Sequence, residues 1–554
     1  MLHEQTSFEG GANLITNEMQ ISATSYKWLM NARQRLGYIE PVKKHVEITN
    51  APAGKKQGHI GIGNVHIIFV AGLAYYRVDG QNNWSNIPGF SMDAIAPRYW
   101  MLAVPSSNFN FVRKNDPTSA NRQIIIDVDF AINGTPASII VQDNVNQPQI
   151  ILYNTATQSF YARDTQTYSE WSITTPEYVP IGRQMIFKNG ITFIVSRDGK
   201  SVNRSVTGRP LDFMVNVDSN GNKLPSEYNG GASSVGFAFD YDEITCLIDS
   251  NAVNVFILAT ARNIRLIAFD YSITIFGEPR FTQAAILEAG IVNQESVVEI
   301  LGDYAFIDFE NIKSFNAVQQ VQNEGRNSIF SLQLASILKD VKQSDPCACI
   351  FDNYALFYIK TLWGNLIAVY DTLSEKWVSF DITRADKIKQ FAFIETVTQT
   401  KLYAITDDDE LFQFYASDDR ELAQLMTRSI TPAADPQHKS QHLKPLFRGG
   451  SLTGNVSVIE YVDEVLSERL TSDFENVSSG INYPVYPPVI PNTIATIKQD
   501  TFTFKDGLVG KKIAFIIQWN TDARLYGFTL STSEVKRDTS LRQQDKILKE
   551  TYSL

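Results

Sequence analysis

The stretch NYALFYIKTLWGNLIAVYDTLSEKWVSF, residues 353–380, decides the fold class of this chain. Apolar and polar residues alternate from Ala355 to Lys360, and Trp363 to Asn365 then form a turn. An apolar run follows from Leu366 to Tyr370, and after a polar turn a further strand begins at Trp377. A period of two bounded by Gly, Asn, Asp and Ser is typical of antiparallel hairpins. The stretch therefore predicts three consecutive antiparallel strands.

The second turn of this stretch has counterparts elsewhere in the chain. Residues 370–377 read YDTLSEKW and residues 153–160 read YNTATQSF, and a looser copy spans 76–84. The Asp or Asn would cap its own turn, and the closing aromatic would pack between neighbouring sheets. Such repetition predicts radially arranged four-stranded sheets, a β-propeller of about six or seven blades, although three unrelated hairpins would also give it. The repeat residues are Tyr153, Asn154, Phe160, Tyr370, Asp371 and Trp377.

Length and texture predict four segments in an all-β chain. At 554 residues the chain is too long for one ordinary core. We expect an extended N-terminal arm (1–58), the propeller body (59–416), a C-terminal β-sandwich-like domain (417–536) and a polar tail (537–554). Seven Lys and Arg face five Glu in the arm, so it carries +2 and the rest carries −13 of the total −11. One amphipathic helix is expected from Ser328 to Asp340.

The charge balance disfavours a dedicated nucleic-acid-binding domain. The chain has 49 basic and 60 acidic residues and no block of five like charges, whereas binding to phosphates needs concentrated Lys and Arg. An acidic wall would still suit a surface that DNA passes without sticking. The sequence shows neither a secretory leader nor a long apolar run, which favours a soluble product made in a cytoplasm.

The sequence presents no catalytic, cofactor or metal motif. No nucleophile elbow, zinc-protease motif or phosphate loop occurs. Cys347 and Cys349 are expected to be buried thiols on one strand face, and His59 and His66 are expected on opposite faces of one strand. Acidic groups such as 407–410 fit solvated turns, and an alternative is a carbohydrate-binding or glycoside-cleaving propeller that uses an acidic pair. A cellular propeller scaffold is a further alternative.

Three stretches carry a resemblance to a known family. The first is Phe8-Glu9-Gly10-Gly11-Ala12-Asn13, with Asn31, Arg33, Arg35 and Gly37-Tyr38-Ile39 after it. The second runs from Gln184 to Phe213 and ends in SVTGRPLDF, and the third runs from Ile244 to Ile307. In this order, and with the later Pro445-Leu446-Phe447, they resemble the tail nozzle proteins of short-tailed bacteriophages, also called packaged-DNA stabilisation proteins.

The resemblance implies a structural virion protein without enzymatic activity. In that family about six copies form a hexameric ring, a nozzle or hub that channels and retains the packaged double-stranded DNA. Neighbours would be an adaptor or portal-proximal ring and fibres or spikes, and assembly would occur in the host cytoplasm. We expect contacts with other copies or partners from the arm and from the proline-rich loop 481–492, through Phe8, Gly10, Gly11, Asn13, Arg33, Arg35, Tyr483 and Tyr486.

Overall fold

The computed structural model shows an all-β chain. It describes residues 2–534 except 6–7, 15–21, 23, 36–37, 105–108, 112–123, 127–130, 133–134, 137, 155–158, 165–178, 209, 212, 214–232, 237–241, 273–277, 325–329, 363, 382–386, 430–439, 451–453, 463–464, 475–496, 502–508, 511–512 and 521–523.

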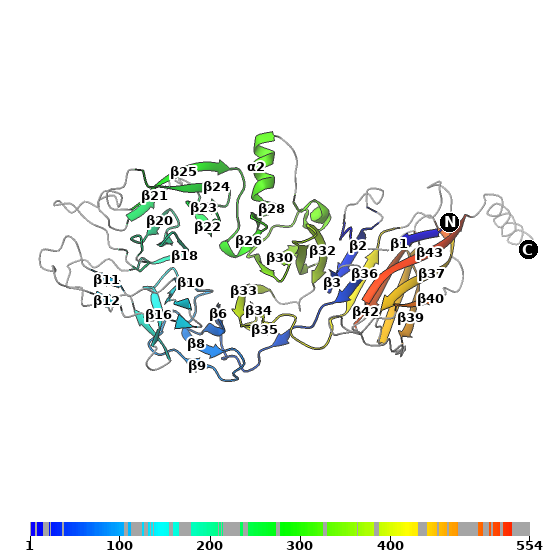
Figure 1. Cartoon of the computed structure of the whole chain (residues 1–554), viewed down its shortest axis with the longest axis horizontal. Helices are drawn as coiled ribbons and strands as arrows, with labels where there is room; N and C mark the ends of the chain where they lie inside the picture. The colour runs from blue at the N-terminus through cyan, green and yellow to red at the C-terminus, as the bar shows by residue number, and fades with distance from the viewer. Residues whose placement is uncertain are drawn as a thin grey trace, which may run out of the picture.

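Seven small antiparallel sheets surround a common centre and form a β-propeller (Figure 1). Their first strands lie nearest the centre, where neighbouring blades contact one another. The blades are blade 1 (β6 Lys56–Ile62, β7 Val65–Val70, β8 Leu73–Val78, β9 Ser85–Asn86), blade 2 (β10 Trp100–Val104, β15 Ser138–Gln142, β16 Gln149–Asn154, β17 Ser159–Asp164), blade 3 (β18 Gly182–Lys188, β19 Ile191–Ser196, β20 Ser201–Arg204, β21 Ser233–Gly236), blade 4 (β22 Ile244–Asp249, β23 Val255–Thr260, β24 Ile264–Asp270, β25 Arg280–Leu287), blade 5 (β26 Val297–Ile300, β27 Asp303–Ile307, β28 Ile312–Ser314), blade 6 (β29 Cys347–Phe351, β30 Tyr354–Thr361, β31 Gly364–Asp371, β32 Lys376–Asp381) and blade 7 (β33 Ile388–Glu395, β34 Thr400–Thr406, β35 Leu411–Gln413, β5 Val46–Glu47).

The ring closes between blades 7 and 1. The short strand β5 precedes blade 1 in the chain, yet it pairs with β35 and so completes blade 7. Ile68 of blade 1 and Ile394 and Tyr403 of blade 7 then share one buried apolar cluster. The predicted propeller is confirmed, with seven blades among the described residues, and its last sheet combines strands from both ends of the propeller segment.

The sequence repeat occupies equivalent places in the fold. Each copy spans the hairpin between the third and fourth strands of a blade, in blades 1, 2 and 6. Tyr153 is paired with Phe160 and Tyr370 with Trp377 across the two strands. Phe160 also lies 4.7 Å, between ring centroids, from Tyr76 of the neighbouring blade. The closing aromatic in blade 2 therefore packs between sheets, as predicted.

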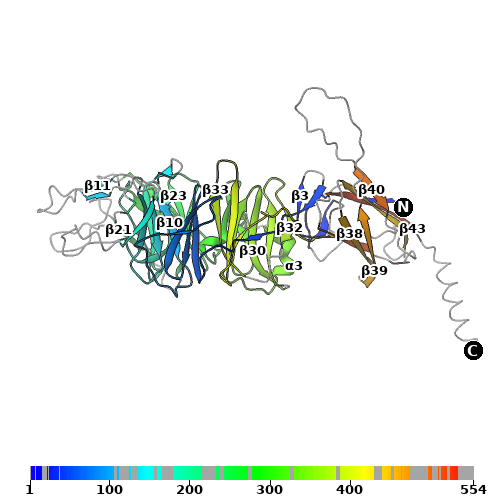
Figure 2. The same ribbon diagram turned by 90° about the horizontal axis from the view of Figure 1, so that it is seen from below.

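Beyond blade 6, along the long axis of the molecule, the outer strands of the blade-6 sheet and one further sheet form what we call the second unit (Figure 2). One sheet continues blade 6 outward from β32 through the strands β2 (Tyr26–Met30), β36 (Ala423–Thr427), β42 (Ile513–Trp519), β38 (Gly454–Val462) and β39 (Val465–Phe474). The other sheet contains β1 (Leu2–Gln5), β3 (Ala32–Arg35), β4 (Tyr38–Pro41), β37 (Ser440–Gly450), β40 (Ile497–Thr501), β41 (Val509–Gly510) and β43 (Arg524–Glu534).

The described strands of the predicted N-terminal arm (1–58) are paired within these sheets and within blades 1 and 7. β1 pairs with β43, β2 lies between β32 and β36, and β4 pairs with β43. Residues 46–47 complete blade 7 and residues 56–62 begin blade 1. The propeller is thus inserted between the first and last strands of the second unit. Residues 535–554, which include the whole predicted tail (537–554), lie outside the described residues.

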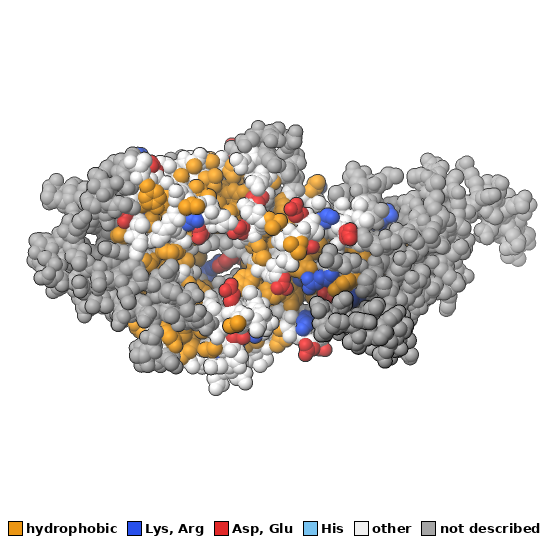
Figure 3. All heavy atoms as spheres, in the orientation of Figure 1, with side chains coloured by type: hydrophobic (Ala, Val, Ile, Leu, Met, Phe, Trp, Pro, Cys, Tyr) orange, Lys and Arg blue, Asp and Glu red, His pale blue; other side chains and the backbone are white. Residues whose placement is uncertain are grey.

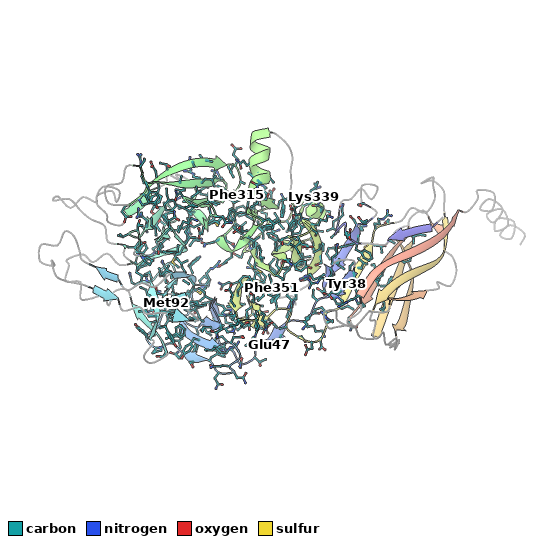
Figure 4. All side chains as sticks on the ribbon, viewed as in Figure 1. Tyr38, Glu47, Met92, Phe315, Lys339 and Phe351 are labelled. Atoms are coloured by element: carbon teal, nitrogen blue, oxygen red, sulfur yellow. The ribbon has the colours of Figure 1, made fainter. Side chains whose placement is uncertain are left out.

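Between blades 5 and 6 the helices differ from the prediction. The helix α2 (Phe315–Glu324) begins at the rim of the propeller, where Figure 4 labels Phe315, and that ring packs on Tyr304 and Phe306. The single helix expected from Ser328 to Asp340 is in fact a 3₁₀ turn, Leu332–Leu334, followed by the short helix α3 (Ala335–Leu338). The sequence of α2 is mostly polar, so it lacked the apolar stripe on which the prediction relied. The remaining described elements are the 3₁₀ turn Gln294–Ser296 and two separate hairpins in the chain between β10 and β15, β11 (Phe109–Phe111) with β12 (Ile124–Ile126) and β13 (Ala131–Ile132) with β14 (Thr135–Pro136).

The repeat predicts a large stability effect at Trp377. Its side chain is buried, and its Nε1 donates a hydrogen bond of 3.1 Å to the Phe330 carbonyl. Trp377→Ala is expected to lower the free energy of unfolding by about 3–5 kcal/mol, as truncation of a buried aromatic does. Leu373→Ala in the turn of the same hairpin, where the leucine is 72% exposed, is expected to change it by less than about 0.5 kcal/mol. Urea unfolding measures both, and equal effects would contradict the packing role of Trp377.

Candidate functional site: the joint between the propeller and the second unit

The strand β2 joins blade 6 to the outer part of the nine-stranded sheet. Met30 pairs with Phe380 of β32 in parallel, and the Asn31 amide donates to the Phe380 carbonyl at 2.9 Å. The Trp28 and Phe380 rings stack with centroids 4.3 Å apart. Asn31 has a φ of 53°, a conformation that asparagine tolerates better than most residues, and there the chain turns from β2 into β3.

A buried ion pair between Arg33 of the second unit and Asp381 of blade 6 holds this joint together. Arg33 Nη1 donates to Asp381 Oδ1 at 2.8 Å and Arg33 Nη2 donates to Asp381 Oδ2 at 2.5 Å. The side chains are only 7% and 1% exposed. The Tyr415 hydroxyl donates to the same carboxylate at 2.6 Å and accepts from Arg33, whose other nitrogen also donates to Ser379 Oγ. One guanidinium thus connects β3, β32 and the chain after β35.

The surroundings keep Arg33 charged and Tyr415 protonated. Burial opposes the charge on Arg33, but Asp381 and Tyr415 together raise the pKa of the guanidinium above its ordinary value. Burial, and then the negative charge of Asp381, raise the pKa of the Tyr415 hydroxyl well above its ordinary value. The tyrosine therefore stays protonated and serves as a hydrogen-bond donor. A bidentate pair of this kind combines strength with a fixed direction.

The Gly10-Gly11 pair forms a second contact between the N-terminal segment and blade 6. Gly11 has a φ of 72°, and a Cβ there would lie 2.6 Å from the Trp377 carbonyl oxygen. The next amide, of Ala12, donates to that same oxygen at 2.8 Å. Only glycine allows this close backbone approach in the left-handed region. The motif is therefore explained by a contact with the aromatic that closes the sequence repeat.

The structure brings most of the predicted contact residues to this joint, inside one chain. Phe8 is buried against Tyr26, and the Asn13 amide donates to the Tyr26 carbonyl at 2.9 Å. Arg35 is 41% exposed, pairs with Glu40 at 2.9 Å and donates to the Tyr354 hydroxyl. Contacts within the chain thus account for Phe8, Gly11 and Arg33, while a role toward neighbouring copies stays a prediction. Tyr483 and Tyr486 lie outside the described residues.

No pattern in the sequence connected Arg33 to Asp381, because the two residues are 348 positions apart. The one indication in the sequence is that Arg33 lies within the strand ARQR, because an arginine that a strand buries needs a partner of opposite charge.

His59 and His66 correct a sequence interpretation. They were expected on opposite faces of one strand, but the chain reverses at Gly63 and Asn64, and the two residues lie on paired strands. His59 Nε2 is 3.3 Å from His66 Nδ1, and His66 Nε2 is 3.5 Å from Asp79 Oδ1. Burial, then Arg77 and Lys401, lower the pKa of His66 to about 3, and burial lowers that of His59 well below its ordinary value.

Four carboxylates from the acidic turns that could serve sugar cleavage pair with basic side chains. Asp407 is 3.6 Å from Lys387 Nζ and Asp409 is 3.0 Å from Lys389 Nζ. Asp242 pairs with Arg262, and Asp418 with Lys43. Within the described ranges no group of three or more His, Cys, Asp and Glu residues is arranged to hold a metal.

Cys347 and Cys349 lie in one apolar cluster, as expected, and burial raises the pKa of both thiols. In the part of the chain that the structure describes, no helix has the length and apolar character needed to cross a membrane.

Comparisons with known proteins give a fold likeness only. No protein-family model and no curated protein sequence matches this chain. A chain of a mitotic checkpoint complex is 8% identical, with 70% of this chain and 97% of that chain covered and a TM-score of 0.36. The β-propeller domain of Cps50 (Swd1) from Myceliophteria thermophila is 9% identical (68% and 100% covered, TM-score 0.34), and the C-terminal WD40 domain of Sif2 is 10% identical (67% and 98%, TM-score 0.35). The strand order described above establishes the propeller independently of these distant likenesses.

The ion pair predicts a strong effect when one partner is removed. Asp381→Asn leaves Arg33 buried without its countercharge, so the free energy of unfolding is expected to fall by about 3–5 kcal/mol. Lys43→Ala removes an exposed pair with Asp418, 3.9 Å apart, and is expected to lower it by at most about 1 kcal/mol. Chemical denaturation of both variants measures the difference. An Asp381→Asn protein as stable as the Lys43→Ala protein would contradict the proposed role of the pair.

The histidine pair predicts a loss of stability in mild acid. Because His66 has a pKa of about 3 in the folded chain and an ordinary value of 6.5, only the unfolded chain gains its proton between these pH values. Stability is therefore complete above about pH 6.5 and falls as the pH decreases, by up to about 1.4 kcal/mol per pH unit for each such histidine. His66→Asn is expected to make the dependence less steep between pH 7 and pH 5. Urea unfolding across this range tests it, and an unchanged slope would contradict the assignment.

Proposed function

We propose that this protein is a structural subunit of a bacteriophage short tail, where about six copies form a ring. The ring acts as a nozzle or hub that channels and retains packaged DNA and anchors neighbouring tail proteins. Its place is the virion, after assembly in the host cytoplasm, and it performs no catalysis. The proposal rests on the ordered motifs from Phe8 to Phe447, of which Gly10-Gly11 and Arg33 prove to lie at one joint.

The continuity of one nine-stranded sheet is the observation that favours this function most. The sheet extends from the innermost strand of blade 6, β29, to β39 in the second unit. Backbone hydrogen bonds join each strand of this sheet to the next, and the Arg33–Asp381 pair adds a side-chain link between the propeller and the second unit. The subunit is therefore long, with a fixed angle between the propeller and the second unit (Figure 1). A ring wall needs such subunits, because each copy must present two surfaces at a constant angle for the ring to close.

The charge distribution fits a wall that DNA passes. The net charge of −11 disfavours tight binding to phosphates. Charged residues at or just before the inner strands of the blades are paired, such as Lys387 with Asp345 and Arg183 with Glu243. In the proposed assembly DNA therefore passes between the subunits, in the lumen of the ring, and not through any single propeller. The second unit serves as a β-sandwich-like domain, and its proline-rich loop with Tyr483 and Tyr486 contacts neighbouring copies.

The proposal predicts the native mass. Light scattering of the purified 62.2 kDa chain, alone and with the other tail proteins of its virion, is expected to give a species of about six subunits in at least one condition. A monomer in both conditions would contradict the proposal. Tyr483→Ala with Tyr486→Ala is expected to shift the ring toward monomers, whereas Tyr271→Ala, an exposed tyrosine of the propeller, serves as the matched control and leaves the mass unchanged.

A further inference from the structure

Three of the six histidines of the chain lie where the propeller ring closes. His59 and His66 are on the two innermost strands of blade 1, and His45 directly precedes β5, the strand that completes blade 7. The sequence contains no histidine between His66 and His438, so blades 2 to 6 have none. Mild acid therefore charges histidine side chains of the propeller only at this closure.

The strand register turns both histidines of blade 1 toward blade 7. His59 is paired with Ile68, which shares a buried apolar cluster with Ile394 and Tyr403 of blade 7. His66 lies two residues before Ile68, so it is on the same face of the sheet. The Tyr403 ring meets both imidazoles edge to face, with centroids 4.7 Å from His66 and 5.7 Å from His59. The histidine pair is thus part of the contact between blades 1 and 7, which we call the closure seam.

The closure seam is packed too closely to hydrate an added charge. His59 is 2% exposed and His66 is fully buried. At Gly61, between them, even a Cβ would collide with the carbonyl of Phe393 in blade 7. A buried charge without hydration or a free counterion is costly. A proton can therefore be accommodated on these imidazoles only if the two blades separate.

Water reaches the inner edge of the closure seam. A hollow of about 190 Å³ lies at one mouth of the propeller centre, and Figure 3 shows charged side chains around a hollow over the middle of the propeller. It is lined by Gly58 of blade 1 and by Gln390 of blade 7, whose Oε1 accepts the His59 amide hydrogen at 3.1 Å. A hollow of this size holds water, so protons have a path to the seam.

The charges around the histidine pair oppose a further positive charge. Burial, then Arg77 of β8 and Lys401 of β34, lower the pKa of His66. Asp79 Oδ1 is 3.5 Å from His66 Nε2, but Lys401 Nζ already binds the other oxygen of that carboxylate at 2.8 Å. The Tyr403 hydroxyl has its pKa raised by burial, so it stays neutral in acid. A protonated His66 would thus face the like charge of Lys401 across the seam.

His45 adds a second proton-sensitive contact at the closure. Its ring packs on Phe414, with centroids 3.9 Å apart, and its Nδ1 accepts a hydrogen bond of 3.4 Å from the Tyr415 amide. Burial lowers the pKa of His45 to about 4, while Asp381 acts against this and Arg33 with it. A proton on Nδ1 would remove the acceptor of the Tyr415 amide. Only the two residues of β5 then remain to hold β35.

We propose that the closure seam opens in mild acid, because protonation of His66 and His59, together with His45, separates blade 1 from blade 7 while blades 2 to 6 stay folded. In the closed ring the pKa of His66 is about 3, and in water it returns to 6.5. The closed form is therefore fully favoured above about pH 6.5. As the pH falls toward 3, the ratio of open to closed form rises by up to about tenfold per pH unit for each histidine. This behaviour does not depend on the proposed role in a tail.

Distances between spin labels, measured by electron paramagnetic resonance, test the opening. The seam pair carries labels at Gln81→Cys of blade 1 and Val397→Cys of blade 7, and the control pair at Val253→Cys and Leu301→Cys of the adjacent blades 4 and 5, all at exposed positions. The three native cysteines are buried, so the introduced thiols are labelled selectively. Between pH 7 and pH 4 the seam distance is expected to lengthen, and to return on neutralisation, while the control distance stays constant.

His66→Asn in the seam-labelled chain is expected to lower the ratio of open to closed form at pH 4.5 by about tenfold or more. His3→Asn, the same change in β1 of the second unit, is the control and should open as the wild type does. If His66→Asn does not fold, His59→Gln replaces it. A seam distance that stays constant to pH 4, lengthening of both label pairs together, or opening of the folded histidine variants at the pH of the wild type would overturn the proposal.

Discussion

The buried pair of Arg33 and Asp381 is the interaction on which the arrangement of the two units depends. The arginine comes from the second unit and the aspartate from the last strand of blade 6. Water is excluded from both, so neither charge is tolerated without the other. This requirement sets the position of β3 against β32. The strand β2, which precedes β3 in the chain, pairs with β32 and extends the blade-6 sheet.

The place where the propeller ring closes lies next to the place where the second unit is attached. After β4 the chain continues through His45 into β5, which completes blade 7, and Tyr415 returns from that blade to the ion pair. The His45 ring packs on Phe414. Ring closure and attachment of the second unit thus involve neighbouring residues of the same chain segments. Such an arrangement would suit the proposed ring, in which the two parts of each copy would keep one relative orientation.

The sequence predicted the local structure well and the distant contacts poorly. Tyr370 and Trp377 lie in a hairpin whose period of two and turn residues are visible within eight positions, so their cross-strand pairing was predictable. Arg33 meets its partner through a fold that no local pattern encodes. The sequence pattern does not separate His59 from His66, because the chain reverses between them through only Gly63 and Asn64 and the residues on both sides are those of a strand.

Amide hydrogen exchange of the N-terminal segment tests the central claim, that this segment is the joint between the two units. In the structure the Asn31 amide donates to Phe380 and β2 lies between two strands. Residues 26–34 are therefore predicted to exchange as slowly as residues 366–370 of blade 6, because both would require opening of the same sheet. Exchange of residues 26–34 at the rate of unstructured chain, with residues 366–370 still protected, would contradict the account.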